Sequence, residues 1–220
     1  MKRAVIDIET VPLVPTSELS PDELRKASLN ALAARVACIG WITLDQQSPV
    51  ESVALVGGME RALLQRFWES MTQSKVASFV AHNGLGFDLP FLWRRSVVNG
   101  VRPPVKLDLR KYRTDFVFDT MQVWANWDTR SYVSLAELAH GLEVGEKNAS
   151  GEDVASLWEL GFYENIATYC LNDCWLTYRL FARMNFFEPQ SIDVPTHVEV
   201  LTNGVLNGPE PASILTDTVA

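Results

Sequence analysis

Apolar and acidic positions alternate near the start of the chain, in the run Ala4-Val5-Ile6-Asp7-Ile8-Glu9-Thr10. Alternate side chains of a β-strand point to opposite faces, so Asp7 and Glu9 are expected on one face and the apolar side chains on the other. Two carboxylates about 7 Å apart along a strand repel each other unless a cation lies between them. The pattern therefore predicts a strand that either carries a metal-binding acidic pair or presents a solvated acidic face at a sheet edge.

Downstream of this strand, apolar spacing predicts alternating helices and strands. We expect helices at about 20–34, 60–71, 89–98, 119–123, 134–140 and 164–186, and strands at 36–44, 50–56, 76–81 and 116–118. Ser20 and Ser134 each precede a glutamate three residues further on, which is typical of a capping box. Residues 101–113 are loop-like, and 189–220 are expected to form a tail or surface-draped extension beyond a domain of residues 1–188.

The order of these elements predicts an α/β fold. Three early strands, followed by helix–strand–helix–strand–helix, suit a mixed five-stranded sheet flanked by helices. An antiparallel meander would form one side of the sheet, and parallel strands joined by right-handed crossovers would form the other. Ligands gather at the carboxyl ends of parallel strands, and both the first acidic pair and residues 82–88 lie at or just past strand ends.

Composition narrows the class of protein. With 220 residues, 47% hydrophobic and 21% charged, the chain suits one large globular domain, and no apolar run reaches the roughly 20 residues of a membrane span. Three cysteines do not make a disulfide framework, so we expect a reducing, cytoplasmic environment. A net charge of −8 argues against a surface that coats nucleic acid generally, yet permits an enzyme that grips only a chain end.

Two further acidic elements follow the first. Asp88 closes the segment Asn83-Gly84-Leu85-Gly86-Phe87-Asp88 just before a predicted helix, where it can cap the helix, bind a metal, or do both. Tyr169 and Asp173 are four residues apart in the last predicted helix, which places both on one face. That aspartate is either exposed on a solvated stripe or buried, and a buried one needs a partner or a metal.

Together these segments resemble the three motifs of the DEDD superfamily of 3′→5′ exonucleases. The motifs are Asp7-Ile8-Glu9-Thr10, then Asn83-x-x-x-Phe87-Asp88, then Tyr169-x-x-x-Asp173. Thr168 stands where the histidine branch would carry its histidine, so the tyrosine branch is the match. Between residues 4 and 186 the chain is most similar to stand-alone exonucleases related to the proofreading domain of family B DNA polymerases. The resemblance implies a ribonuclease H-like fold.

The resemblance also implies a two-metal mechanism. Asp7, Glu9 and Asp173 would hold one Mg²⁺ or Mn²⁺, with Asp7 bridging to a second ion that Asp88 binds directly or through water. Two such ions stabilise the attacking and leaving oxygens of an in-line phosphoryl displacement. Tyr169 would orient the attacking water, because an unperturbed tyrosine pKa near 10 makes it a poor base.

Thr10, Asn83 and Phe87 are expected to bind substrate near the terminal nucleotide, as members of the matched motifs. For Asn83 the alternative is a turn residue, since asparagine is common at the ends of strands. We expect no membrane partner, and a nucleic acid as the substrate.

Candidate phosphate contacts come from basic residues in loops. Arg110 and Lys111 belong to a basic cluster within residues 94–113, where the alternative is a solvated loop. Lys147, in a loop before the last helices, has the ordinary surface lysine as its alternative.

Four other chemically interesting residues have structural interpretations. Asp119 is expected to cap the helix that follows it, and His82 to be structural. Cys170 and Cys174 are interpreted as small core residues, because no second pair of metal-ligating residues lies nearby in sequence.

The sequence thus predicts a metal-dependent 3′→5′ exonuclease acting on single-stranded DNA ends. The same chemistry on RNA is the first alternative, since only a pocket for the 2′-hydroxyl separates the two substrates. A non-catalytic nucleic-acid-binding module is the second, and the loss of a carboxylate would mark it. All four acids are present.

Overall fold

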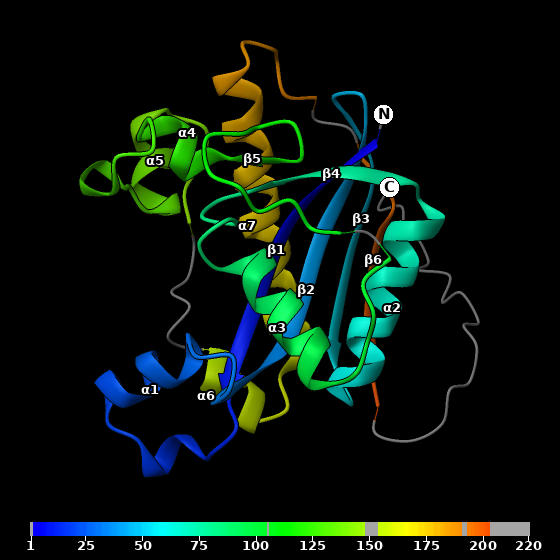
Figure 1. Ribbon diagram of the computed structural model, residues 1–220, viewed down its shortest axis with the longest axis vertical. Helices are drawn as coiled ribbons and strands as arrows, with labels where there is room; N and C mark the ends of the chain where they lie inside the picture. Colours follow the sequence, from blue (N-terminus) through cyan, green and yellow to red (C-terminus); the bar gives the residue numbers. More distant parts are fainter. Residues whose placement is uncertain (1, 105, 148–153, 191–192, 203–220) are drawn as a thin grey trace, which may run out of the picture.

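The fold is built on one mixed β-sheet, seen in a computed structural model that describes residues 2–104, 106–147, 154–190 and 193–202 (Figure 1). The strands are β1 Lys2–Pro12, β2 Ala34–Asp45, β3 Ser48–Gly57, β4 Val76–Ala81, β5 Val117–Asp119 and β6 Thr196–Leu201. Their order across the sheet is β5-β4-β1-β2-β3-β6. The predicted antiparallel meander is β1, β2 and β3, and the predicted parallel strands are β1, β4 and β5.

The expected number of five strands is wrong, because β6 adds a sixth. It lies within the segment expected as an extension and pairs in parallel with the outer edge of β3. Ser52 donates a backbone hydrogen bond to Pro195 just before β6, which satisfies a group that the free edge would leave open. The sequence did not predict this strand because its short run of strand-forming residues lies within a segment rich in Pro and Thr.

Helices cover both faces of the sheet. They are α1 Pro21–Ser28, α2 Glu60–Gln73, α3 Asp88–Val98, α4 Thr120–Trp124, α5 Leu135–Gly141, α6 Val154–Glu159 and α7 Tyr163–Met184. Short 3₁₀ turns occur at Thr16–Glu18 and Thr129–Ser131. In Figure 1, α2 and α3 lie in front of the sheet and α7 behind it, while α1 and α6 lie at one end and α4 and α5 at the other.

The alternation in β1 decides which side chains enter which core layer. Ile6 and Ile8 are buried with Phe67 of α2 and Phe91 of α3, as predicted for the apolar face of the strand. Asp7 and Glu9 therefore point to the opposite face, which α7 covers. No helix of the described residues is both long enough and apolar enough to cross a membrane.

Local capping signals were accurate at most helix starts. Both predicted capping boxes form, at Ser20 and at Ser134. The first helix ends earlier than expected, at Ser28 rather than near residue 34. Asn30 explains the difference: its carbonyl accepts from two later backbone amides, and its side chain accepts from the amide of Leu32, so the chain turns into β2.

Candidate active site

A glycine in β2 lets α7 approach the acidic face of β1. Gly40 lies opposite Asp7, and a Cβ added there would come within 2.8 Å of the Cys170 Sγ atom on α7. Cys170 in turn donates a hydrogen bond from its thiol to the Asp7 backbone oxygen, at 3.3 Å. Both Cys170 and Cys174 are completely buried, as predicted for core residues. This close packing brings the Asp173 face of α7 against Asp7 and Glu9.

The second acidic element reaches the site through a tight loop. An added Cβ at Gly84 would meet the Ala81 Cβ at 2.3 Å, so this position requires glycine, and one at Gly86 would displace the Asn83 side-chain oxygen, also at 2.3 Å. Asn83 has a φ of 63°, which agrees with its interpretation as a turn residue. Asp88 is the first residue of α3 and is 4% exposed; Phe87 occupies the N-cap position without a side-chain cap. The interpretation of Asp88 as the N-cap residue of this helix is therefore wrong.

Asp119 does more than the predicted capping of α4. Its carboxylate accepts from the backbone amides of Met121 and Gln122 in α4, and also from those of Asn83 and Leu85. It thus fastens the loop that delivers Asp88. His82 is structural, as expected: its ring nitrogens pair with a hydroxyl of Thr120 at 2.9 Å and with a backbone oxygen at 3.0 Å.

In this cluster Asp88 and Asp173 are buried and Asp7 and Glu9 are half-buried, and loss of solvent raises the pKa values of all four. The pKa of Asp7 and that of Glu9 lie well above the ordinary carboxyl range because of desolvation first, the adjacent Cys170 sulfur second and neighbouring carboxylates after that. Burial, with the nearby charge of Asp119, raises the pKa of Asp88 to about 8. The pKa of Asp173 is also raised by burial, although Lys147 and Tyr169 work in the opposite direction.

The donor set fits a divalent cation. Oδ2 of Asp7 and Oδ1 of Asp173 are buried oxygens that find no hydrogen-bond partner among the described residues. Ligand atoms of Asp7, Glu9 and Cys170 all lie within 4.8 Å of one another. Clustered carboxylate oxygens of this kind are the ligands that Mg²⁺ and Mn²⁺ prefer, and a bound cation would compensate both their charge and their missing partners.

Lys147 is the nearest cation to this cluster among the contacts of the described residues. Its Nζ atom lies 2.5 Å from Oδ2 of Asp173 and 4.9 Å from the ring centroid of Tyr169. All three side chains line one pocket of about 360 Å³ on the surface of α7. The sequence singled out Lys147 only as a candidate phosphate contact, because an ion pair across 26 residues leaves no local signal.

The other predicted substrate contacts occupy different surroundings. The hydroxyl of Thr10 donates to the backbone oxygen of Ser28 at 2.7 Å, which ties the end of β1 to the end of α1. The ring of Phe87 packs against Phe91, with 5.3 Å between centroids. Contact of Thr10, Asn83 or Phe87 with substrate stays a prediction.

Arg110 and Lys111 are exposed on the loop between α3 and β5. Arg110 forms a two-pronged ion pair with Asp108, so part of its charge is already matched. A phosphate role for either residue stays a prediction.

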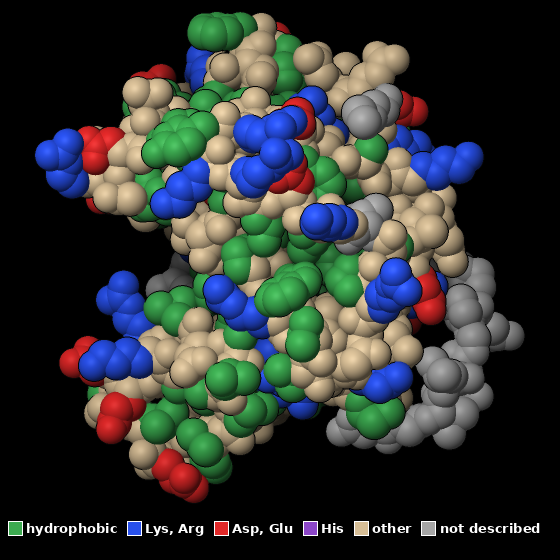
Figure 2. All heavy atoms as spheres, in the orientation of Figure 1, with side chains coloured by type: hydrophobic (Ala, Val, Ile, Leu, Met, Phe, Trp, Pro, Cys, Tyr) green, Lys and Arg blue, Asp and Glu red, His purple; other side chains and the backbone are tan. Residues whose placement is uncertain are grey.

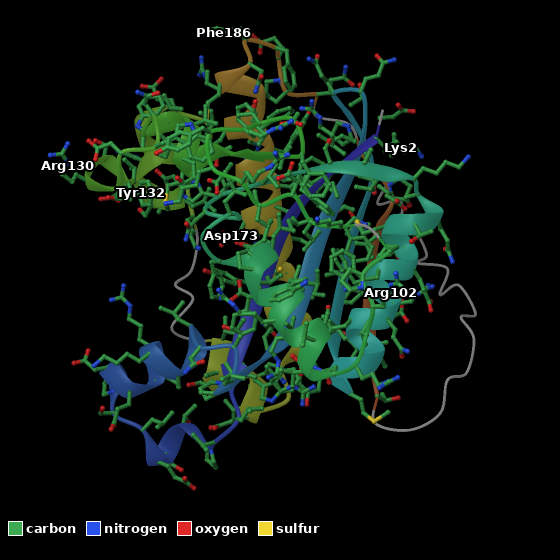
Figure 3. All side chains as sticks on the ribbon, viewed as in Figure 1. Lys2, Arg102, Arg130, Tyr132, Asp173 and Phe186 are labelled. Carbon is green, nitrogen blue, oxygen red and sulfur yellow. The ribbon has the colours of Figure 1, made fainter. Side chains whose placement is uncertain are left out.

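A hollow in the molecular surface leads to the site. Figure 2 shows it on one side of the molecule, between the end that carries α1 and α6 and the end that carries α4 and α5. Figure 3 places Asp173 on the same side of the molecule as this hollow. The cluster opens to the surface at Asp173, through the pocket that Lys147 and Tyr169 also line.

A comparison with known families identifies the class to which this chain, with its sheet and acidic cluster, belongs. Residues 27–202 match the family of predicted 3′→5′ exonucleases related to the exonuclease domain of PolB, and the chain belongs to this family. The matched segment contains Asp88, Tyr169 and Asp173. Asp7 and Glu9 precede it, and the structure brings them beside the other three.

Two individual proteins are similar to this chain, one in sequence and one in fold. Over 161 residues the chain is 25% identical to an uncharacterized protein of Methanocaldococcus jannaschii, covering 72% of this chain and 77% of that one. The fold is similar to that of the family B DNA polymerase from the hyperthermophilic archaeon Pyrobaculum calidifontis, with a TM-score of 0.63 and 16% identity. That match covers 84% of this chain and 24% of the polymerase chain. The predicted α/β sheet architecture is thereby confirmed.

Proposed function

We propose that this protein is a metal-dependent 3′→5′ exonuclease that removes nucleotides from the 3′ ends of single-stranded DNA. The observation that carries the proposal is the convergence of carboxylates from three separate elements, half-buried on β1 and buried on α3 and α7. Two of these carboxylates keep an oxygen without a hydrogen-bond partner in the described part of the chain. Burying several acids together is costly, and an ordinary structural role does not account for it.

We infer the metal ligands from the acidic cluster together with the motifs that the sequence shares with the exonuclease superfamily. Asp7, Glu9 and Asp173 would hold one Mg²⁺ or Mn²⁺, and Asp7 and Asp88 would hold a second. When bound, such ions supply positive charge for the attacking and leaving oxygens of an in-line phosphoryl displacement. This assignment of ligands belongs to the tyrosine branch of the superfamily.

Tyr169 positions water rather than removing its proton. Burial and the surrounding acids raise its pKa far above the ordinary phenol value, so the hydroxyl stays protonated at any physiological pH. A protonated phenol can accept from and donate to a water molecule, which fixes that water without changing its charge. The ammonium group of Lys147, above the Tyr169 ring, holds the Asp173 carboxylate in place.

The test follows a 5′-labelled strand of DNA, and one of RNA, with Mg²⁺, with Mn²⁺ or with EDTA. We expect a ladder that shortens from the 3′ end of DNA and disappears in EDTA. Asp7→Asn should abolish it, because the metal loses a shared ligand. Tyr169→Phe should slow it by 10²-fold or more while leaving the fold intact, on the scale of a lost positioning group.

Asp45→Asn is the matched control, since Asp45 is an exposed acid at the end of β2. It should digest at the wild-type rate. Digestion at the wild-type rate by Asp7→Asn would refute the proposed site, and internal cleavage products would refute exonuclease activity. Faster shortening of RNA than of DNA would indicate that the protein is an exoribonuclease with the same active site.

A further inference from the structure

An exposed apolar groove lies apart from the acidic cluster, between the turn that follows α1 and the outer face of α3. Its volume is about 560 Å³, and its walls include Leu29, Leu32, Trp93, Arg94, Val97 and Val98. Leu32 is 78% exposed, Val97 61% and Trp93 50%. Figure 2 shows hydrophobic side chains gathered over this part of the molecule, on the face that carries α3. Contiguous exposed apolar surface of this kind marks an interaction site.

A buried ion pair holds the two walls of the groove together. Arg95, on the inner face of α3, donates from Nη1 to the Ala31 backbone oxygen at 2.8 Å and from Nε to Oε1 of Glu60, also at 2.8 Å. Glu60 accepts from the Val36 amide at 2.8 Å, just inside β2. The turn at residues 29–33 is therefore fastened to α3 from beneath. The exposed side chains stand on a preformed surface.

The position of the groove can be measured from the acidic cluster along α3, the helix that carries both Asp88 and one groove wall. The helix that forms one wall begins at Asp88, and a rise of 1.5 Å per residue puts Trp93 and Val97 about 8 and 14 Å further along its axis. The other wall follows Ser28, whose backbone oxygen accepts from Thr10 at the end of the strand that carries Glu9. At about 3.4 Å per stacked nucleotide, the distance of about 8 to 14 Å from Asp88 to Trp93 and Val97 corresponds to roughly two to four nucleotides.

Exposed cations lie in the groove wall and in the helix that precedes its first wall. Arg94 lies in the groove wall, and Arg25 and Lys26 lie in the last turn of α1. All three are exposed, and none comes within 4 Å of an acidic partner in the described residues. In a chain of net charge −8, a rigid aromatic and aliphatic surface beside three such cations suits bases that stack and phosphates that pair.

We propose that this groove binds the nucleotides about two to four positions upstream of the 3′ end. A base would stack on the Trp93 indole, and a phosphate would pair with Arg94. The proposal rests on the proposed function, because it takes the acidic cluster as the place where the 3′ end lies. It assigns to the turn after α1 a role in gripping the single strand.

The experiment measures KM for oligothymidylates of two, four and six nucleotides. Stacking contributes about 1–3 kcal/mol per base, so Trp93→Ala should raise KM for the hexamer about tenfold or more. The increase for the dimer, which is too short to span the groove, should stay below threefold. Trp93→Phe should keep most of the affinity. Arg94→Glu should raise KM for the hexamer and weaken its dependence on salt.

Phe186→Ala is the control, because Phe186 is 97% exposed and lies far from Asp173 in Figure 3. It should leave KM unchanged at all lengths. An equal effect of Trp93→Ala on every length, or no effect, would overturn the groove proposal. A wild-type dimer that Trp93→Ala converts to monomers with unchanged KM would also overturn it, in favour of self-association.

Binding without turnover separates this proposal from the proposed function. Fluorescence anisotropy of a labelled hexamer in EDTA reports the groove alone. If wild-type protein digests no strand but binds the hexamer through Trp93, the nuclease assignment fails and the groove stands. If digestion proceeds normally and Trp93→Ala affects neither binding nor KM, the groove fails and the nuclease stands.

Discussion

Replacing Asp88 by asparagine tests whether the acidic cluster is as buried as the structure has it. Asp88 is 4% exposed, and its pKa is raised from 3.8 to about 8, by burial first. Between those two values the folded protein keeps a proton that the unfolded chain releases, so the free energy of unfolding falls as pH rises. The slope from this group is about 1.4 kcal/mol per pH unit, or roughly 3 kcal/mol between pH 5 and pH 7.

Asparagine keeps the shape of the side chain and cannot ionise. In EDTA, the free energy of unfolding of Asp88→Asn relative to that of wild type should therefore increase by roughly 3 kcal/mol as the pH rises from 5 to 7. For a chain of this size, that is a relative rise in melting temperature of roughly 6–12 °C. Thermal unfolding of both proteins, followed by circular dichroism across the pH range, measures the difference. Parallel curves for the two proteins would refute the burial of this charge.

Two other predictions concern residues that support the site. Arg95→Met should destabilise the fold by about 3–5 kcal/mol, because it leaves Glu60 as a buried charge without its partner. Chemical denaturation measures the loss, and a change below about 1 kcal/mol would contradict the role of this ion pair. Burial lowers the pKa of His82 to about 4, so its ring should remain neutral down to pH 5 in NMR titrations. Because the unfolded chain protonates this histidine near pH 6.5, its contribution to stability should fall as pH drops from about 6.5 to 4, and a ring that titrates near 6.5 in the native protein would contradict this.

Local patterns in the sequence predicted much of this molecule. The alternation in residues 4–10 determined which face of β1 enters the core, and two Ser–Glu pairs marked helix starts that the structure contains. Such signals depend on residues within one turn or one strand of each other. The α6 helix and the sixth strand escaped because neither has a strong local pattern, and β6 exists through its pairing with β3.

Long-range contacts could not be predicted in the same way. The sequence predicts that Asp119 caps a helix, and it does. Its hydrogen bonds from the amides of Asn83 and Leu85 depend instead on the pairing of β4 with β5. The position of Lys147 against Asp173 likewise depends on how a loop returns to α7. Burial itself is a tertiary property, so the raised pKa values of the acids follow only from the fold.

The charge balance of the site links its stability to its chemistry. Four acids, Asp7, Glu9, Asp88 and Asp173, share one buried region, while Lys147 pairs directly with only the last of them. Each raised pKa means that the free energy of unfolding decreases when the acid ionises. A cation that binds only the native state increases the free energy of unfolding and so offsets this loss. At one hundred times its dissociation constant, such a cation stabilises the fold by about 2.7 kcal/mol. Metal affinity should therefore rise with pH, because the same deprotonations that weaken the metal-free fold create the ligands, and saturating metal should remove the fall in the free energy of unfolding that is expected in EDTA.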